Sequence, residues 1–209
     1  KALVTAGPTR EYIDPVRYLS NESSGKQGFE IAKALSRLGI ETTLITGPTN
    51  LVSNKDIKIK KIITASEMFE TVKKNLPADI AVCAAAVTDF KPVYKSKFKL
   101  KKNNLRLKSF ELQKNIDILE FLSKNNKHRP KIVIGFAAET ENLDKNALSK
   151  LKQKNCDIII ANDISKKDSG FNSDYNRVSI IDNSGKIKVV KKNKKSFIAN
   201  IIADIILDK

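Results

Sequence analysis

Short apolar runs alternate along this chain with longer segments in which apolar residues recur at the spacing of a helix face. The runs stop at Gly, Pro or polar residues and predict strands, whereas the periodic segments predict helices. The predicted strands are residues 2–6, 42–46, 57–63, 79–86, 131–138, 157–161, 178–182 and 186–190. One predicted helix opens at Ser23-Ser24-Gly25 and closes at Gly39, and the others cover residues of about 64–76, 115–123, 142–154 and 196–207.

This order of elements predicts the fold class. Strands and helices alternate, and the strands at 79–86 and 131–138 are apolar almost throughout. Strands of that kind are typical of a parallel sheet that is covered on both faces. We therefore expect an α/β, Rossmann-like three-layer fold with a mainly parallel sheet. Its length of 209 residues suits one domain, residues 1–209.

The charge of the chain first suggests a polyanionic partner. Lys and Arg total 39 and Asp and Glu total 23, for a formal net charge of +16. However, only six of the basic residues are Arg, and Trp is absent. Nucleic-acid readers depend on Arg for bidentate contacts and on aromatic rings for stacking. We therefore expect no nucleic-acid partner, and a non-enzymatic polyanion-binding module remains only as an alternative.

The cysteine and histidine content excludes several other classes. Cys83 and Cys156 lie inside apolar runs without a pairing pattern, which predicts free thiols and a cytoplasmic location. The single histidine, His128, makes a histidine metal site or a Ser-His catalytic pair very improbable. No apolar run approaches the ~20 residues of a membrane-spanning helix, so no membrane partner is expected.

Polar or small residues occur where four of the predicted strands should end. In open α/β sheets, ligands bind beyond the carboxyl ends of the strands. The four segments that this rule selects are Ala6–Arg10, Ala84–Asp89, Phe136–Thr140 and Ala161–Asp163. Their agreement predicts a ligand site at one edge of the sheet.

The segment Asn21–Gly28 (NESSGKQG) has the composition of an anion cradle. Its small residues Ser23, Ser24 and Gly25, followed by Lys26, would let backbone N–H groups approach a phosphate at a helix N-terminus. It matches neither the P-loop nor the G-x-G-x-x-G pattern. A simple helix cap with a turn glycine explains the same residues equally well.

Other candidate residues also allow two interpretations. Asp89 could hold Mg²⁺ or a nucleoside group, or it could cap a turn. The Lys-rich segment 95–102 could be a mobile loop that brings positive charge to a phosphate, or an edge strand protected by lysines. Lys150 and Lys154, four residues apart on one helix face, could contact a triphosphate or simply face solvent.

Taken together, six stretches resemble one known family. They read VTAGPTREYIDPVRYLSNESSGKQGFEIA, CAAAVTDFKP, FKLKK, NIDIL, GFAAETENL and IIIANDISKKDSGFNSD. In this order they are similar to the phosphopantothenoylcysteine synthetase domain of bacterial bifunctional coenzyme A biosynthesis proteins. The resemblance implies that this chain is the C-terminal part of a longer protein. An N-terminal flavin-dependent decarboxylase would then hold FMN, which this chain would not bind.

The resemblance implies a ligase that joins 4′-phosphopantothenate to L-cysteine through an acyl-cytidylate, with CTP and Mg²⁺. Asn21 matches the family's asparagine that steadies the acyl-cytidylate carbonyl, and Lys99 matches the lysine of a mobile loop over the CTP phosphates. The resemblance implies that Asp89 is a Mg²⁺ ligand. The remaining matches to CTP contacts are Ala85, Asp89, Ile116, Asp117, Ile118, Leu119, Phe136, Lys150 and Lys154. Ile116 departs from the proline that is usual in the family, so the turn there could be looser.

The resemblance also implies a homodimer, with a small β-hairpin or flap at about residues 90–110 as the subunit contact. A different enzyme class, an NAD(P)-dependent Rossmann oxidoreductase, would share the sheet. That class requires a glycine fingerprint that this chain lacks.

Overall fold

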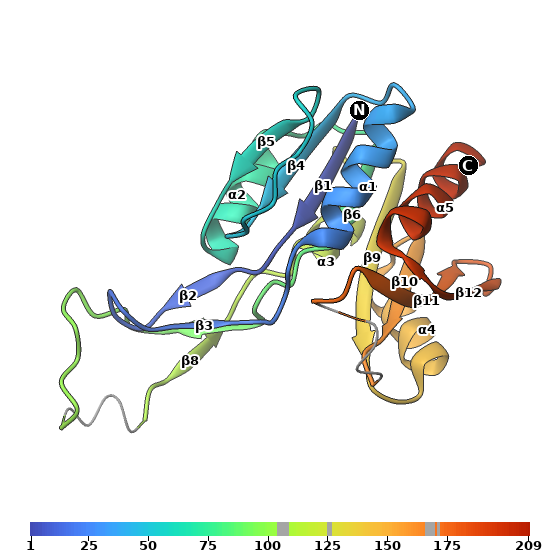
Figure 1. The fold of residues 1–209 in the computed structure, drawn as a ribbon. Coiled ribbons are helices and arrows are strands. Elements are labelled where there is room, and N and C mark those ends of the chain that lie inside the picture. Colours follow the sequence, from blue (N-terminus) through green and yellow to red (C-terminus); the bar gives the residue numbers. More distant parts are fainter. Residues whose placement is uncertain (104–108, 125–126, 166–169, 171) are drawn as a thin grey trace.

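An eight-stranded sheet with helices on both faces forms the body of the protein (Figure 1). The computed structural model describes residues 1–103, 109–124, 127–165, 170 and 172–209. In spatial order the strands are β12 (Ile187–Lys194), β11 (Tyr175–Asp182), β10 (Ile158–Asp163), β9 (Ile132–Glu139), β6 (Ile80–Cys83), β1 (Ala2–Ala6), β4 (Thr42–Thr46) and β5 (Lys58–Lys61). The helices are α1 (Lys26–Arg37), α2 (Ala65–Lys74), α3 (Ile118–Lys124), α4 (Leu143–Lys154) and α5 (Lys195–Leu207).

The strands from β10 to β5 run parallel, and β11 and β12 close the other edge as an antiparallel pair. This arrangement confirms the predicted α/β class and mainly parallel sheet. The chain builds outward in both directions from β1, which lies between β4 and β6. The strand order therefore reverses between β1 and β6, and ligands of open α/β sheets bind beside such a reversal.

The two faces of the sheet carry separate hydrophobic clusters. One cluster packs α1 and α5 against the sheet through residues such as Leu35 and Ile202, and the other packs α2, α3 and α4 through residues such as Met68, Leu122 and Ala147. Alternate residues of β10 belong to the two clusters, as expected for a strand buried on both sides. The protein is therefore a three-layer α/β/α domain.

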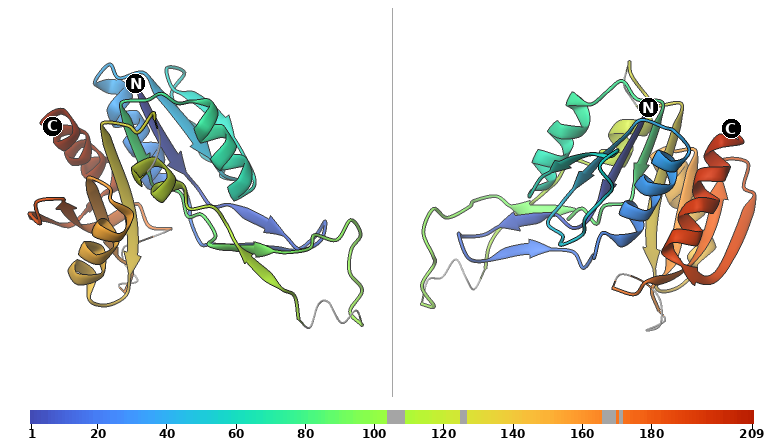
Figure 2. Two further views of the ribbon diagram at one scale, coloured as in Figure 1. Left: turned by 180° about the vertical axis from the view of Figure 1, so that it is seen from behind. Right: turned by 45° about the horizontal axis from the view of Figure 1, so that its top comes forward.

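A long arm projects from one edge of this body (Figures 1 and 2). It contains two short antiparallel ribbons, β2 (Arg10–Tyr12) with β3 (Tyr18–Ser20), and β7 (Phe90–Pro92) with β8 (Leu112–Lys114). The expected hairpin near 90–110 corresponds to the second ribbon, although residues 104–108 of that prediction lie outside the described residues. The sequence did not predict the β2–β3 ribbon.

Several boundaries differ from the prediction. The strand predicted at 79–86 ends at Cys83. Beyond it, Ala86 forms only an isolated parallel bridge with Pro8. Conversely, β9 and β10 extend to Glu139 and Asp163, so the polar residues expected after these strands are still within them. The two strands extend this far because residues 158–163 of β10 pair with residues 134–139 of β9, up to the ends of both strands.

Close contacts of two glycines position the elements around the sheet's carboxyl end. A Cβ on Gly28 of α1 would lie 2.6 Å from the Cβ of Ala6, so this glycine lets the helix lie directly on the end of β1. A Cβ on Gly135 would lie 2.5 Å from a methyl group of Leu119, so the second glycine makes room for the start of α3. In the described part of the chain, no helix is long and apolar enough to cross a membrane.

Candidate functional site

A groove with two connected lobes lies at the carboxyl ends of β1, β6, β9 and β10. The first lobe has a volume of about 440 Å³ and the second about 540 Å³. Five residues line both lobes, namely Ala85, Val87, Asp89, Phe136 and Lys150. The groove therefore occupies the position where the strand order reverses, which agrees with the site predicted from the strand ends.

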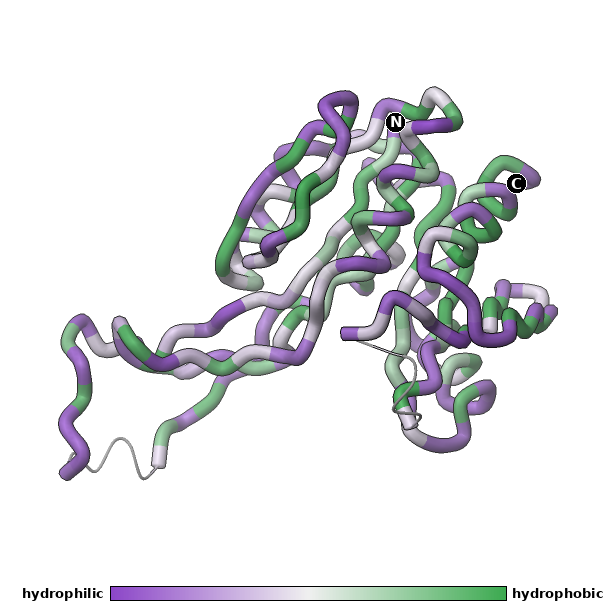
Figure 3. Tube along the Cα trace, in the orientation of Figure 1, coloured by the Kyte–Doolittle hydropathy of each residue, from purple (hydrophilic) through white to green (hydrophobic). Residues whose placement is uncertain are grey.

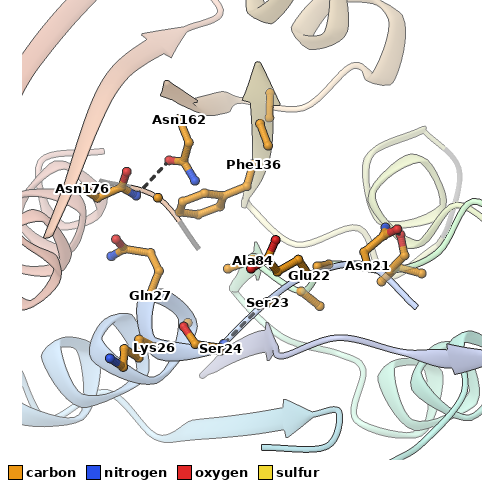
Figure 4. A pocket seen from close by; sticks show the side chains of 18 of the residues that line it. Asn21, Glu22, Ser23, Ser24, Lys26, Gln27, Ala84, Phe136, Asn162 and Asn176 are labelled. Atoms are coloured by element: carbon orange, nitrogen blue, oxygen red, sulfur yellow. Dashed lines mark hydrogen bonds between the residues drawn. The ribbon is translucent and has the colours of Figure 1, made fainter. Parts of the chain in front are cut away.

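The N-terminus of α1 borders the first lobe. The residues of the predicted cradle, Ser23, Ser24, Gly25 and Lys26, all line it. Figure 4 shows three of them, Ser23, Ser24 and Lys26. Gly25 is the N-cap residue, with φ of 76°, and no side chain caps the helix. The Ser23 hydroxyl instead accepts a hydrogen bond from the Gly25 N–H at 3.2 Å. The N-cap residue thus offers the first-turn N–H groups no side-chain acceptor, and the helix dipole adds positive potential there.

Polar side chains that the sequence analysis did not name individually form one end of the first lobe. Figure 4 shows Gln27, Asn162 and Asn176 together at this end, with Asn21 at the other. Asn176 donates to the Asn162 side chain at 3.2 Å, and Gln27 donates to the Lys195 carbonyl at 3.2 Å. Lys195 is buried, and burial together with the nearby Lys26 lowers its pKa to about 8. This end of the lobe is therefore rich in hydrogen-bonding groups.

Asn21 joins the start of α1 to the segment that follows β6. Its Nδ2 atom donates to the Val87 carbonyl at 3.0 Å. The neighbouring residues Ala84 and Ala85 lie beside the end of β1, because their N–H groups donate to the backbone and side chain of Thr5, respectively. The small alanine side chains leave the groove open between Asn21 and Phe136.

The turn at residues 116–119 borders the second lobe. Ile118 and Leu119 are buried in the core, so their side chains anchor the turn while its outer side lines the groove. Asp117 accepts a hydrogen bond from the Glu120 N–H at 2.8 Å and thereby caps α3. Ile116 is 51% exposed. This turn therefore keeps an ordered cap although Ile116 replaces the family's usual proline.

Lys150 and Lys154 have different surroundings although they share a helix. Lys150 lines both lobes and donates to the Phe136 carbonyl at 2.9 Å. Lys154 pairs with Asp117 at 2.8 Å and with Glu120 at 3.1 Å. Burial alone would lower the pKa of Lys154, but these two carboxylates raise it. In this structure the charge of Lys154 is therefore largely neutralised by α3.

Asp89 lies at the junction of the two lobes and is exposed. No group of three or more His, Cys, Asp or Glu residues among the described residues could form a metal centre. A divalent cation at Asp89 would therefore need further oxygen ligands from a bound substrate. Mg²⁺ commonly binds in this way, through one or two carboxylates together with phosphate oxygens and water.

Lys99 is the one predicted site residue that does not line the groove. It is exposed on the arm, beside the buried Leu100. Asp14 fixes this segment, because its carboxylate accepts hydrogen bonds from the N–H groups of Val16, Arg17 and Leu100. Although burial opposes the charged form, these bonds and the Arg17 side chain lower the pKa of Asp14 to about 2. The arm therefore holds the Lys99 segment in place, away from the groove.

The described part of the groove does not contain an activated thiol. Cys83 lines the second lobe, but burial, followed by the Asp117 charge, raises its pKa to about 12. Burial also raises the pKa of Cys156 to about 11. Both thiols are free and stay protonated at neutral pH. Neither thiol is therefore activated as a thiolate nucleophile at neutral pH.

The whole chain matches one known protein family. The model of the family described as DNA/pantothenate metabolism flavoprotein C-terminal domain matches residues 1–209. The chain belongs to this family. The chain is also 44% identical over 208 residues to the coenzyme A biosynthesis bifunctional protein CoaBC of Borreliella burgdorferi. It is 41% identical over 204 residues to the protein of the same name from Haemophilus influenzae.

These two matches cover 99% and 97% of this chain but 52% and 50% of the relatives. The chain thus spans about half the length of the curated relatives that it matches. Among solved structures, the C-terminal domain of a CoaBC protein superposes with a TM-score of 0.82 at 33% identity, covering 99% of this chain and 95% of that one. The family membership and the fold therefore agree with the resemblance on which the sequence analysis relied.

The structure brings together most of the residues that the sequence analysis selected. Of the predicted site residues, all except Lys99 line one or both lobes. Sequence reasoning missed Gln27, Asn176 and Lys195. Each is a polar residue at a buried position. Asn176 lies between the exposed Tyr175 and the partly exposed Arg177, so no apolar stretch in the sequence marks its buried position.

Proposed function

We propose that this domain is a CTP-dependent phosphopantothenate–cysteine ligase that works through an acyl-cytidylate. The observation that supports the proposal most directly is the two-lobed groove itself. It places a helix N-terminus without an N-cap side chain and a nucleotide-sized second lobe on either side of Ala85 and Phe136. Such a groove can hold two anionic reactants next to each other, as ligation of a carboxylate to a nucleotide requires.

The two lobes would divide the substrates. The second lobe, with the turn 116–119, Lys150 and Lys154, would take CTP, as the family resemblance implies. The first lobe, with Ser23 to Lys26 at the start of α1, would take phosphopantothenate and bind its phosphate through backbone N–H groups. The carboxylate of phosphopantothenate and the α-phosphate of CTP would then meet near Asn21 and Ala85.

Two bond-forming steps follow from this arrangement. In the first, a carboxylate oxygen attacks the α-phosphorus of CTP, the bond to the β-phosphate breaks, and pyrophosphate leaves. In the second, the amine of L-cysteine attacks the acyl carbon, an amide forms, and CMP leaves as the amine loses a proton. The Asn21 amide would donate to the acyl oxygen, where negative charge develops during the second step.

Asp89 is the residue that would hold Mg²⁺ at the junction of the lobes. Its exposed carboxylate faces the space that a triphosphate would occupy. When bound, the cation would neutralise phosphate charge and favour departure of pyrophosphate. Lys150, which also lines both lobes, would add a second positive charge near the phosphates.

We also propose that the domain works as a homodimer through its arm. The arm exposes large apolar side chains, including Phe98 at 81% and Tyr94 at 58%, and Figure 3 shows apolar stretches along it. Patches of this kind commonly mark protein–protein contacts. Lys99 lies on the arm, outside the groove. It would therefore reach the CTP phosphates only if the arm moves, or if the arm of a second copy of the chain brings its own Lys99 to this groove.

Pyrophosphate release tests the proposed activity. With CTP, Mg²⁺ and L-cysteine present, release is expected only when phosphopantothenate is added, and mass spectrometry should detect phosphopantothenoylcysteine. Release with ATP but not with CTP would refute the choice of nucleotide. The absence of release with either nucleotide would refute the ligase proposal and leave the polyanion-binding alternative.

A further inference from the structure

Asn115 connects the two chain segments that border the second lobe. It lies between β8 and the turn 116–119 and itself lines the lobe. Its backbone N–H donates to the Asp89 carbonyl at 2.8 Å, and its side-chain Nδ2 donates to the Thr88 carbonyl at 2.8 Å. One residue therefore binds two consecutive carbonyl groups of the segment that presents Asp89.

The same segment is also held by Thr9, which lies between β1 and β2. The Thr88 N–H donates to the Thr9 hydroxyl at 3.1 Å, and the two threonine hydroxyls are 3.1 Å apart. Thr9 and Thr88 are both buried. The backbone at Thr88 is thus clamped between Thr9 and Asn115, so the Asp89 carboxylate has a defined position relative to the turn.

The side chain of Asn115 has a feature that packing alone does not explain. Its Oδ1 atom is buried and has no hydrogen-bond partner among the described residues. A buried acceptor without a partner destabilises the fold, so a residue selected only for stability would not leave one here. The amide makes its side-chain hydrogen bond through Nδ2 to the Thr88 carbonyl, while its Oδ1 atom remains without a partner.

We propose that Asn115 is a positioning residue that sets the Asp89 carboxylate against the turn 116–119, so that the phosphates and the base of one nucleotide are bound at the same time. This inference rests on the proposed function, in which Asp89 holds the Mg²⁺ at the phosphates and the turn 116–119 binds the nucleoside. Asn115 would act on nucleotide binding through these two segments. Binding of phosphopantothenate in the first lobe would not depend on it.

The substitution Asn115→Ala tests this role, because it removes the Nδ2 bond and keeps the backbone bond to Asp89. The matched control is Asn75→Ala, which removes an Asn side-chain bond to the Thr71 carbonyl on α2, away from the groove. In the ligand-free protein, hydrogen exchange of residues 87–92 and 115–119 is expected to accelerate in Asn115→Ala and to remain unchanged in Asn75→Ala. Unchanged exchange in both variants would overturn the positioning role.

Steady-state kinetics supplies the second measurement. The KM for CTP is expected to rise about tenfold in Asn115→Ala, the effect of losing one well-placed hydrogen bond, while the KM for phosphopantothenate stays within about twofold. An equal rise in both values would show a general structural defect and contradict the inference. If the wild-type protein does not use CTP, the proposed function fails, whereas the exchange experiment still decides whether Asn115 positions the Asp89 segment.

Discussion

Replacing Lys99 by Gln is expected to lower kcat by about 10²-fold or more while the domain remains folded, because a cation that offsets charge developing on the phosphates is lost. The substitution removes the charge and keeps most of the side chain's length. Lys99 is exposed and its neighbour Leu100 anchors the segment, so the arm should keep its structure. Pyrophosphate release and thermal melting, measured on the same preparation, would check both parts of this expectation.

Lys101→Gln is the matched control for this substitution, because Lys101 is an exposed lysine two residues away on the same segment. It changes the net charge of the arm by the same amount, so turnover close to that of the wild type is expected. If both variants lose activity equally, the effect belongs to the general charge of the arm. Near-normal turnover in Lys99→Gln would contradict the proposed role of Lys99 at the CTP phosphates.

Replacing Asn21 by Asp is expected to lower kcat by about 10²- to 10³-fold, as does removal of one oxyanion donor elsewhere. The carboxylate cannot donate to the acyl oxygen, and it would also face the Val87 carbonyl that the Nδ2 atom now contacts at 3.0 Å. The exposed position of Asn21 should let the fold tolerate the change. Single-turnover measurements would separate formation of the acyl-cytidylate from the attack by cysteine.

The control for this variant is Asn200→Asp on α5. Asn200 accepts a hydrogen bond from Arg37 at 3.0 Å, so the new carboxylate would keep a partner and introduce the same charge away from the groove. Its turnover should match that of the wild type. An Asn21→Asp enzyme with normal kcat and normal cysteine dependence would contradict the role proposed for the Asn21 amide.

The central sheet could be predicted from the sequence because burial on both faces leaves a clear pattern. In strands such as β1 and β4, all residues are apolar except for threonines. Each of these strands is followed by Gly-Pro. The arm could not be predicted in this way. Its strands are three residues long, and β3 and β8 are largely exposed, so neither periodicity nor an apolar run distinguishes them.

The candidate site was predictable where residues follow strand ends, as Ala85 and Asp89 follow β6. The position of Lys99 was not predictable, because a spacing of ten residues from Asp89 does not reveal that β7 carries the chain away from the groove. The pairing of Lys154 with Asp117 and Glu120 depends on how α3 packs against α4, a contact between residues more than thirty positions apart. The helical spacing of Lys150 and Lys154 could not indicate that only one of them is neutralised.

The lysine excess of the whole chain, which first suggested a polyanionic partner, is not repeated among the residues that line the second lobe. The described residues lining the second lobe include three lysines, Lys114, Lys150 and Lys154, but also the acids Asp89, Asp117 and Glu120. A lobe of such balanced charge suits a nucleotide bound with its own cation better than an extended nucleic acid. The net charge of +16 is therefore not concentrated among the residues of this lobe.

A crystal structure of this domain with CTP, Mg²⁺ and phosphopantothenate would test the central claim most directly. We expect the nucleotide in the second lobe, with its base against residues 116–119 and its phosphates at Asp89, and the pantothenate carboxylate between Asn21 and Ala85. Nucleotide bound outside the groove, or both substrates bound with the carboxylate remote from the α-phosphate, would contradict it.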